Sequence, residues 1–190
     1  MLPTFFFGTG GGHVGYKWTL ILAEQKIKPL LKATLDHLAK QGFKVVVILT
    51  GHYPGEQVKL VHALASEAGR RHPGVRFIAL AEREVTTPQP GDRAAGDHAA
   101  KYETSIAMAL NPAWVRMDRL TEGRNSATTT LATTPKRDAP THDPRHPLYA
   151  IYGQDPRTAA SSELGDKLIA EIVSRLAAKV EDALAGKPQR

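Results

Sequence analysis

Hydrophobic positions recur along this chain with two alternating periods, and their order predicts the fold. Residues 24–40 carry apolar side chains at helical spacing, and Gly42 ends this predicted helix. A β-branched run at 43–49 then predicts a strand, which is followed by a helix at about 56–70 and a second strand at 76–81. Farther along, leucine, isoleucine and valine side chains four residues apart predict a long final helix over 163–184.

This alternation of helices and strands is typical of an α/β fold with a parallel sheet. The run 43–49 is apolar on both faces, which is typical of a central strand covered by helices on each side. We therefore predict a three-layer α/β/α arrangement with a mostly parallel central sheet, formed by one domain over 1–190. Residues 121–147 are rich in Thr, Pro, Arg and His without any periodicity, and we predict that they form a lid or an oligomer arm.

Titratable side chains follow the carboxyl ends of both predicted strands, where open α/β sheets bind ligands. His52 lies three residues after the first strand, and the long loop after the second strand delivers Asp97, His98 and Glu103. If the two strands are neighbours, His52 and Glu103 can converge on one cation. The alternative is that His52 is a solvated or helix-capping loop residue.

The segment 97–115 concentrates acidic and histidine side chains where a loop turns into a helix, and Asn111-Pro112 stops that helix. Groups held at a helix entrance suit metal or proton chemistry, because the backbone there is rigid and its dipole favours negative charge. In the alternative interpretation, Glu103 only places a negative charge in the first turn of the helix, while Asp97 and His98 are solvated loop residues.

A glycine-rich stretch at 8–15 formally satisfies G-x-G-x-x-G through Gly10, Gly12 and Gly15. A dinucleotide site needs a helix immediately afterwards, whereas 16–22 has the pattern of an extended segment, so the nucleotide-binding interpretation is the weaker one. We expect instead that the glycines let the backbone run close to a ligand or a neighbouring subunit, with His13 as a further candidate for the same pocket.

Composition limits the metal ligands, the cellular location and the partners that the protein can have. The 190 residues include no cysteine, so any metal must be held by histidine and carboxylate, which suits zinc, manganese or iron. No apolar run reaches the ~20 residues that a membrane span needs, and 1–7 lacks the basic start of a signal peptide, so a cytoplasmic protein is the default. The net charge of +6 is not concentrated in a basic stripe, which argues against nucleic-acid binding.

Three stretches together resemble the creatininase family of metal-dependent amidohydrolases. The first is a Gly-His-Tyr loop after a strand, Thr50-Gly51-His52-Tyr53. The second is an acidic residue followed by His-Ala, with Glu-Thr-Ser shortly afterwards: Asp97-His98-Ala99-Ala100 and Glu103-Thr104-Ser105. The third is a turn before the last helix, Asp155-Pro156-Arg157. The resemblance covers nearly the whole chain in the right order. It implies a creatininase-like fold, a small-molecule amide substrate and a homo-oligomer, which is a hexamer in the family.

The resemblance also implies roles for individual residues. His52 would be a metal ligand, and Glu103 would bind the metal or a metal-bound water. Asp97 and His98 would handle protons during amide hydrolysis, with His98 donating to the leaving nitrogen. Tyr53 and Glu56, beside His52, are candidates for the substrate pocket.

The chain also departs from the family pattern. It has no copy of the Glu-x-His-Gly-Pro-His stretch that supplies most ligands of the two-metal centre in the family, so it is expected to lack that N-terminal segment. Pro54 stands where creatinine-hydrolysing members place an acidic ligand. Occupancy of the metal site is therefore in doubt, because catalytic zinc usually has three protein ligands. The alternative function is that of a non-catalytic relative with a degenerate metal site, used for binding or assembly.

Overall fold

The computed structural model describes residues 4–11, 20–87, 97–120, 151 and 153–187. The chain divides into two compact units, Met1–Thr86 with Ser174–Arg190, and Thr87–Val173. The prediction of a single domain over 1–190 therefore stays a prediction.

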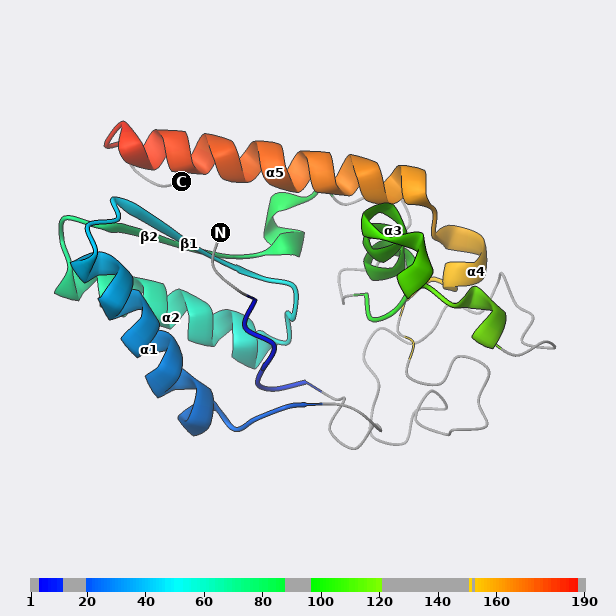
Figure 1. The fold of residues 1–190 in the computed structure, drawn as a ribbon, viewed down its shortest axis with the longest axis horizontal. Helices are drawn as coiled ribbons and strands as arrows, with labels where there is room; N and C mark the ends of the chain where they lie inside the picture. Colours follow the sequence, from blue (N-terminus) through cyan, green and yellow to red (C-terminus); the bar gives the residue numbers. More distant parts are fainter. Residues whose placement is uncertain (1–3, 12–19, 88–96, 121–150, 152, 188–190) are drawn as a thin grey trace. The chain divides into compact units, whose positions relative to one another are not determined.

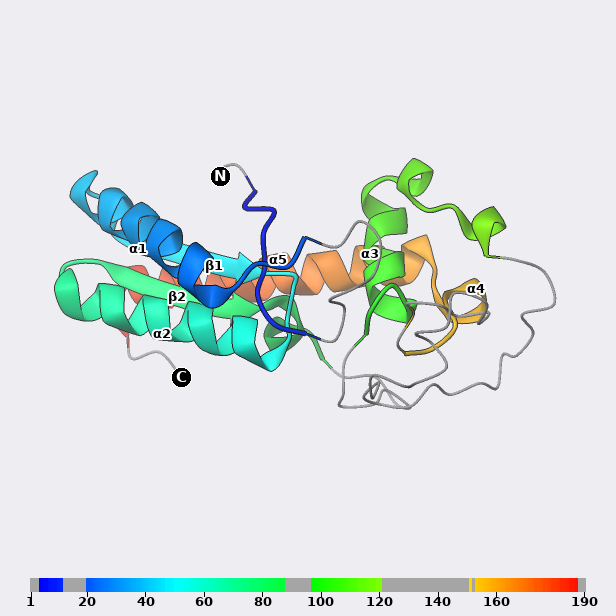
Figure 2. The ribbon, with the colours of Figure 1, turned by 90° about the horizontal axis from the view of Figure 1, so that it is seen from below.

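The first unit is a parallel two-stranded sheet with helices packed against it. Its elements are α1 (Glu24–Lys40), β1 (Val45–Thr50), α2 (Gly55–Arg71) and β2 (Arg76–Ala81), followed by a short 3-10 helix, η1 (Glu82–Val85). The strands pair in parallel along their whole length. Helices α1 and α2 lie on one side of the sheet, and residues 174–184 of helix α5 (Ser162–Leu184) lie on the other (Figures 1 and 2). The predicted α/β class with a parallel sheet is thus confirmed.

The core of this unit lies between the two helices and one face of the sheet. The strong helical repeat of α1 and α2 supplies most of it, because apolar side chains three and four residues apart share one face. The sheet contributes side chains from alternate positions of both strands. The buried cluster consists of Ile27, Leu35, Leu38, Val46, Leu60, Val61, Leu64, Ala65, Ala68, Phe77 and Ala79.

The opposite face of β1 is less covered than the sequence predicts. Val46 is buried at 7% exposure, whereas Val47 keeps 37% and Leu49 45% of its surface exposed. Helices thus lie on both sides of the strand, as predicted, but this face of β1 keeps part of its apolar surface exposed. The physical reason is that residues 174–184, on that side of the sheet, bury only Ala183.

An ion cluster ties α1 to the end of α2. Asp36 Oδ1 accepts hydrogen bonds from Arg71 Nη2 and His72 Nε2, both at 2.8 Å, and Lys32 Nζ lies 3.2 Å from Oδ2. Burial raises the pKa of Asp36, but the hydrogen bonds from His72, Arg71 and Lys32 outweigh it and hold this pKa well below its ordinary value. The cations at the end of α2 thus join the two helices.

The second unit is mainly helical. It contains α3 (Lys101–Leu110), the 3-10 helices η2 (Pro112–Trp114) and η3 (Met117–Arg119), α4 (Pro156–Ala159) and the first half of α5 (Ser162–Leu184). The predicted stop of α3 is confirmed, since Asn111 follows its last residue and accepts a hydrogen bond from Ala113 N at 3.0 Å. The sequence did not predict η2, η3 or α4.

Close contact between α3 and α5 depends on one glycine. A Cβ atom at Gly165 would lie 2.0 Å from Ser105 O and 2.7 Å from Ala109 Cβ, so only glycine fits there. Ser105, fully buried, accepts a hydrogen bond from Ser161 N at 3.1 Å. The backbones of the two helices therefore approach each other directly.

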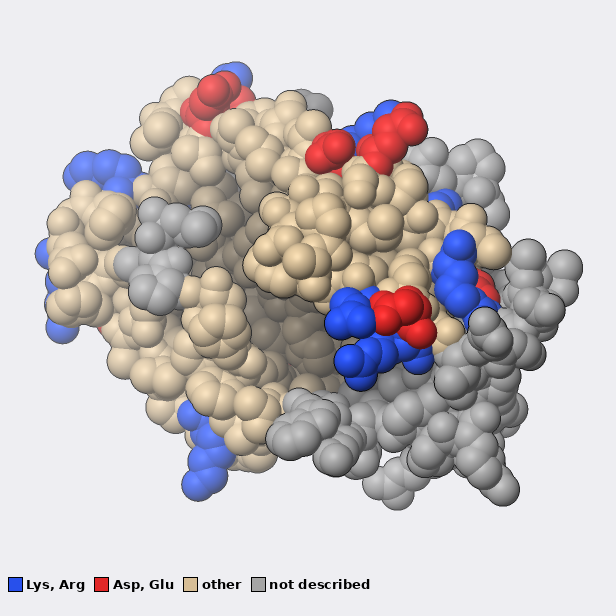
Figure 3. All heavy atoms as spheres, turned by 45° about the vertical axis from the view of Figure 1, so that its right-hand side comes forward, with Lys and Arg blue, Asp and Glu red and all other residues tan. Residues whose placement is uncertain are grey.

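Two features of the described structure bear on binding to membranes and to nucleic acids. No helix in the described ranges is long and apolar enough to cross a membrane. Among the described residues of the face drawn in Figure 3, lysine and arginine side chains are scattered and several stand beside carboxylates, without forming a continuous basic stripe.

Candidate functional site

The two strands are neighbours in one parallel sheet, which was the condition set for convergence of His52 and Glu103. Thr50, the last residue of β1, pairs with Ala81, the last residue of β2, so both carboxyl ends lie at one edge of the sheet. His52 lies two residues after the end of β1, at this edge, as predicted.

His52 is neither freely solvated nor a helix cap. Its ring Nε2 lies 3.2 Å from Thr9 O. Its backbone is held by Thr50, whose Oγ1 donates to His52 O at 2.7 Å and accepts from His52 N at 3.2 Å. The loop therefore fixes both the backbone and the ring of this histidine.

The glycine-rich segment approaches this loop very closely. A Cβ at Gly8 would lie 2.6 Å from His52 Cδ2, and one at Gly10, which has φ of +74°, would lie 2.6 Å from Glu56 Oε2. The expected close approach of the backbone is thus made to side chains of this same chain, His52 and Glu56. His13 lies outside the described residues.

Tyr53, the neighbouring pocket candidate, lies under a cation. The Arg83 guanidinium carbon is 5.2 Å from the centre of the Tyr53 ring, a cation–π arrangement. Arg83 belongs to η1, which follows β2, so this contact joins the two loops at the carboxyl edge of the sheet.

In the second unit, Asp97 fixes the start of α3. The residue is only 9% exposed, and its Oδ2 accepts hydrogen bonds from Tyr102 N at 3.1 Å and Glu103 N at 2.8 Å. These backbone donors belong to the first turn of α3, where N–H groups have no partner within the helix. The alternative of a solvated Asp97 is therefore wrong.

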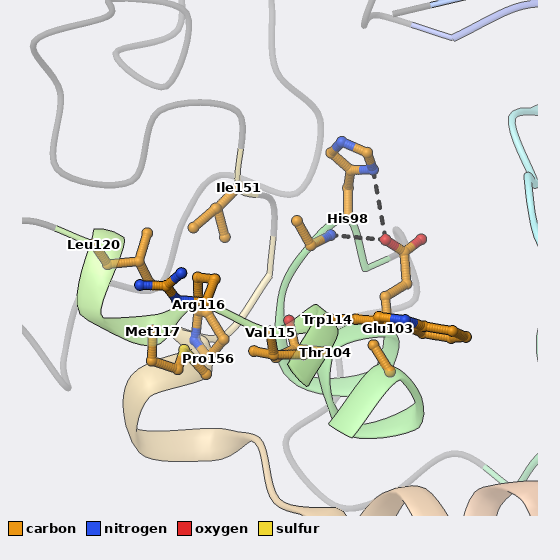
Figure 4. A pocket seen from close by; sticks show the side chains of 12 residues that line it. His98, Glu103, Thr104, Trp114, Val115, Arg116, Met117, Leu120, Ile151 and Pro156 are labelled. Carbon is orange, nitrogen blue, oxygen red and sulfur yellow. Dashed lines mark hydrogen bonds and ion pairs between the residues drawn. The ribbon is translucent and has the colours of Figure 1, made fainter. Parts of the chain in front are cut away.

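His98 and Glu103 form a pair next to Asp97. Glu103 Oε2 accepts a hydrogen bond from Ala99 N at 2.7 Å and lies 3.6 Å from His98 Nδ1 (Figure 4). Ala99 adopts φ of +49°, a left-handed conformation rare outside glycine. Such local strain is typical of functional sites.

The third motif packs against the second. Asp155, 4% exposed, accepts a hydrogen bond from Arg157 N at 3.0 Å and pairs with the Arg157 guanidinium. A Cβ at Gly153, which has φ of +124°, would lie 2.9 Å from Ala100 Cβ and 3.2 Å from Asp97 Oδ1. The turn before the last helices thus supports the loop that carries Asp97 and His98.

An open pocket of about 500 Å³ adjoins the His98–Glu103 pair. Figure 4 shows the indole of Trp114 beside Glu103 and apolar side chains farther along. The sequence did not single out these apolar residues, because they lie on η2 and η3 and next to α4, which lack a periodic pattern. The pocket is lined by His98, Ala99, Glu103, Thr104, Ala107, Trp114, Val115, Arg116, Met117, Leu120, Ile151 and Pro156.

The predicted site residues fall into two sets. His52, Tyr53 and Glu56 belong to the first unit, whereas Asp97, His98 and Glu103 belong to the second. Convergence of His52 and Glu103 on one cation stays a prediction. Across the described residues, no three His, Asp or Glu side chains are grouped as a metal would require.

The donor chemistry of His52 nevertheless fits a metal ligand. Metal-bound histidines almost always donate their other ring N–H to a carbonyl or carboxylate, and Thr9 O occupies that place on Nε2. The candidate carboxylates, together with a neutral imidazole, form the donor set that zinc and manganese accept.

Comparisons with known proteins agree on the family. The family model for creatininase, creatinine amidohydrolase, matches residues 1–180. A protein from Bacteroides fragilis NCTC 9343 with a provisional assignment as a creatinine amidohydrolase is structurally similar, with a TM-score of 0.65 and 22% identity over 93% of this chain and 69% of that one.

Two structures of creatininase mutants are similar to the same degree. A tryptophan-to-phenylalanine mutant has a TM-score of 0.66 with 21% identity over 88% of this chain and 67% of that one. A glutamate-to-glutamine mutant complexed with creatine has a TM-score of 0.65 with 22% identity over 88% of this chain and 68% of that one. No curated protein sequence gives a match. By the extent of the family match, the chain belongs to the creatininase family.

Proposed function

We propose that this protein is a metal-dependent amidohydrolase that cleaves a C–N amide bond in a small cyclic or linear amide. The observation that carries the proposal is the His98–Glu103 pair beside the pocket of about 500 Å³. That volume falls within the range of small-molecule sites, which is roughly 300–1,000 Å³. Family membership supports the hydrolytic class, and a creatininase relative has been solved with creatine.

His98 is the proposed proton donor to the leaving nitrogen. Glu103 faces Nδ1 of its ring, so it can orient the imidazole and stabilise its protonated form, as carboxylates do for catalytic histidines. Asp97 is proposed to take part in proton transfer beside His98, and its Oδ2 is held in place by the two backbone N–H groups of the α3 turn that donate to it.

His52 and Glu103 are the residues proposed to hold a divalent ion. When bound, such an ion polarises the amide carbonyl and lowers the pKa of water to about 7. Within this chain, Thr9 and Thr50 hold His52, and Ala99 N fixes Glu103. The proposed partners are a small amide substrate and further copies of the chain, in the cytoplasm.

A second candidate function rests on Pro54. Proline stands where the resemblance to creatinine-hydrolysing members implies an acidic ligand, and proline has no metal-binding side chain. A relative that keeps the fold for binding or assembly, without turnover, would accommodate this change.

Hydrolysis assays separate the two functions. The full chain, supplied with zinc or manganese, is tested against creatinine and a panel of cyclic and linear amides. We expect turnover in the wild type and a loss of about 10²–10⁴-fold in His98→Ala, the usual contribution of a positioned acid or base.

The matched control is His62→Ala, on the exposed side of α2, where Nε2 lies 3.3 Å from Glu84. It should keep wild-type turnover. If the wild type binds amides without hydrolysing them, the second function holds. Equal turnover in wild type and His98→Ala would refute the role given to His98.

A further inference from the structure

We propose that Gln57 is a positioning residue that fixes the tautomer of His52, so that Nδ1 is the ring nitrogen that meets a ligand. The assignment of the tautomer rests on geometry alone. The inference that Nδ1 binds a metal rests on the proposed function. All the residues concerned belong to the first unit.

The first step is the contact between His52 and Thr9. A backbone carbonyl only accepts hydrogen bonds, so the 3.2 Å contact from Nε2 to Thr9 O requires a proton on Nε2. In a neutral imidazole the other nitrogen, Nδ1, then carries the lone pair. Within the described ranges no hydrogen bond is made to Nδ1.

The second step is how Thr9 is held. Thr9 N donates to Gln57 Oε1 at 3.1 Å, and Gln57 Nε2 donates to Thr50 Oγ1 at 3.4 Å. Thr50 in turn exchanges two hydrogen bonds with the His52 backbone. The four residues therefore form a closed loop of hydrogen bonds with Gln57 as the bridge.

This loop is buried. Thr9 is 5%, Gln57 6% and Thr50 8% exposed, so a polar group left without its partner there would cost the desolvation energy. Removing the Gln57 amide would leave both Thr9 N and Thr50 Oγ1 with fewer partners. Thr9 O, the acceptor for His52, would then lose its fixed position.

Steric contact acts in the same direction. Gly8 packs against one edge of the ring, where a Cβ would lie 2.6 Å from His52 Cδ2 and 3.1 Å from Nε2. Nδ1 lies on the opposite edge. The Nε2 edge of the ring is thus occupied by a hydrogen bond and by packing against the protein, and Nδ1 is the nitrogen that can bind a ligand.

The direct test is ¹⁵N NMR of the full chain labelled at histidine, with the His52 signals assigned by their loss in His52→Gln. We expect the Nε2–H tautomer in the wild type without metal. In Gln57→Met, which keeps the length of the side chain without its amide, we expect a mixture of tautomers. An Nδ1–H tautomer in the wild type, or identical spectra for wild type and Gln57→Met, would overturn the proposal.

The chain offers a matched control in Gln41→Met. Gln41 also contacts a histidine, with Nε2 3.0 Å from His37 Nε2, but it does so at the exposed end of α1. This variant should leave the His52 spectrum unchanged. The wild-type spectrum by itself decides the tautomer if Gln57→Met does not fold.

Zinc titration of the same samples tests the link to a ligand. We expect zinc to shift Nδ1 of His52 and leave Nε2 protonated, and Gln57→Met to bind about 10–100-fold more weakly. Zinc binding through Nε2 would overturn the proposal. If zinc leaves the wild-type Nε2–H signals unchanged, the metal role of His52 is refuted, whereas a mixture of tautomers in Gln57→Met would still support the positioning by Gln57.

Discussion

At the scale of single residues, the carboxylate of Asp97 connects structure to proposed chemistry. It is nearly buried, and its Oδ2 satisfies two backbone donors at the start of α3. The adjacent His98–Glu103 pair depends on that same turn, because Glu103 is one of the residues that Asp97 holds. Asp97 therefore positions the pair whatever part it takes in proton transfer.

Replacing Asp97 should destabilise the protein. We expect Asp97→Ala to lower the free energy of unfolding by about 1–3 kcal/mol, because the helix start loses its acceptor and buried N–H groups lose their partner. Denaturant titration followed by circular dichroism measures this change. Asp118→Ala, which removes an exposed carboxylate paired with Arg116, is the control and should leave the midpoint unchanged. Equal midpoints for all three proteins would contradict the capping role.

The chemical type of the site residues was predictable, but their surroundings were not. The order of strands places His52 at the carboxyl edge of the sheet, and this follows from hydrophobic periodicity. Its hydrogen bond to Thr9, 43 residues away, follows from packing that no local pattern records. The glycines at 8 and 10 indicated a close backbone approach, but not which side chains would meet them.

At the scale of elements, strong periodicity predicted the boundaries well. The bounds of α1 and β2 agree with the predicted ranges, and α2 and α5 differ by one residue at most at each end. The elements η2, η3 and α4 were missed because each has only three or four residues, too few for a period to show. The apolar wall of the pocket comes from these elements, so the sequence could not predict it.

The α3–α5 contact leads to a prediction about two glycines. Gly165→Ala should lower the free energy of unfolding by about 1–3 kcal/mol or more, since its Cβ would overlap the Ser105 carbonyl and neither backbone can easily move. Gly69→Ala is the matched control in α2, where nothing lies within 4 Å of the added atom, and it should stabilise by about 0.5–1 kcal/mol. Thermal unfolding of both variants checks the pair. A similar shift in both would show that α3 and α5 do not approach closely.

The junction of α1 and α2 should depend on pH through Asp36. Because folding lowers the pKa of this carboxyl, its stabilising contribution is fully present above the unfolded pKa of about 3.9 and is lost as pH falls toward the folded value. We expect Asp36→Asn to cost about 1–2 kcal/mol at neutral pH, and the difference from wild type to shrink below about pH 4. Urea titration at a series of pH values measures it.

A control variant and a clear failure case complete this experiment. Asp182→Asn removes an exposed carboxylate that pairs with Lys187 and should not change the pH profile. A wild-type advantage over Asp36→Asn that stays constant from pH 7 to pH 3 would contradict the assigned pKa direction.

At the scale of the whole molecule, the candidate residues are shared between two compact units. The first unit contributes His52 and the second contributes Asp97, His98 and Glu103. Family membership and the fold were both foreseeable, because three motifs and the periodic elements follow one another in the expected order. Convergence of His52 and Glu103 on one cation stays a prediction, because neither periodicity nor a local motif determines how the two units dock.

Turnover measured at a defined metal load tests the central claim most directly. The full chain is equilibrated with zinc or manganese, and its bound metal is determined by mass spectrometry. In the same samples, we follow hydrolysis of whichever amide of the substrate panel the wild type cleaves. We predict that turnover rises in proportion to bound metal, that His52→Ala loses both metal and turnover, and that His98→Ala keeps metal but loses turnover. Less than about half an ion per chain at saturation, or undiminished turnover in either variant, would contradict the account.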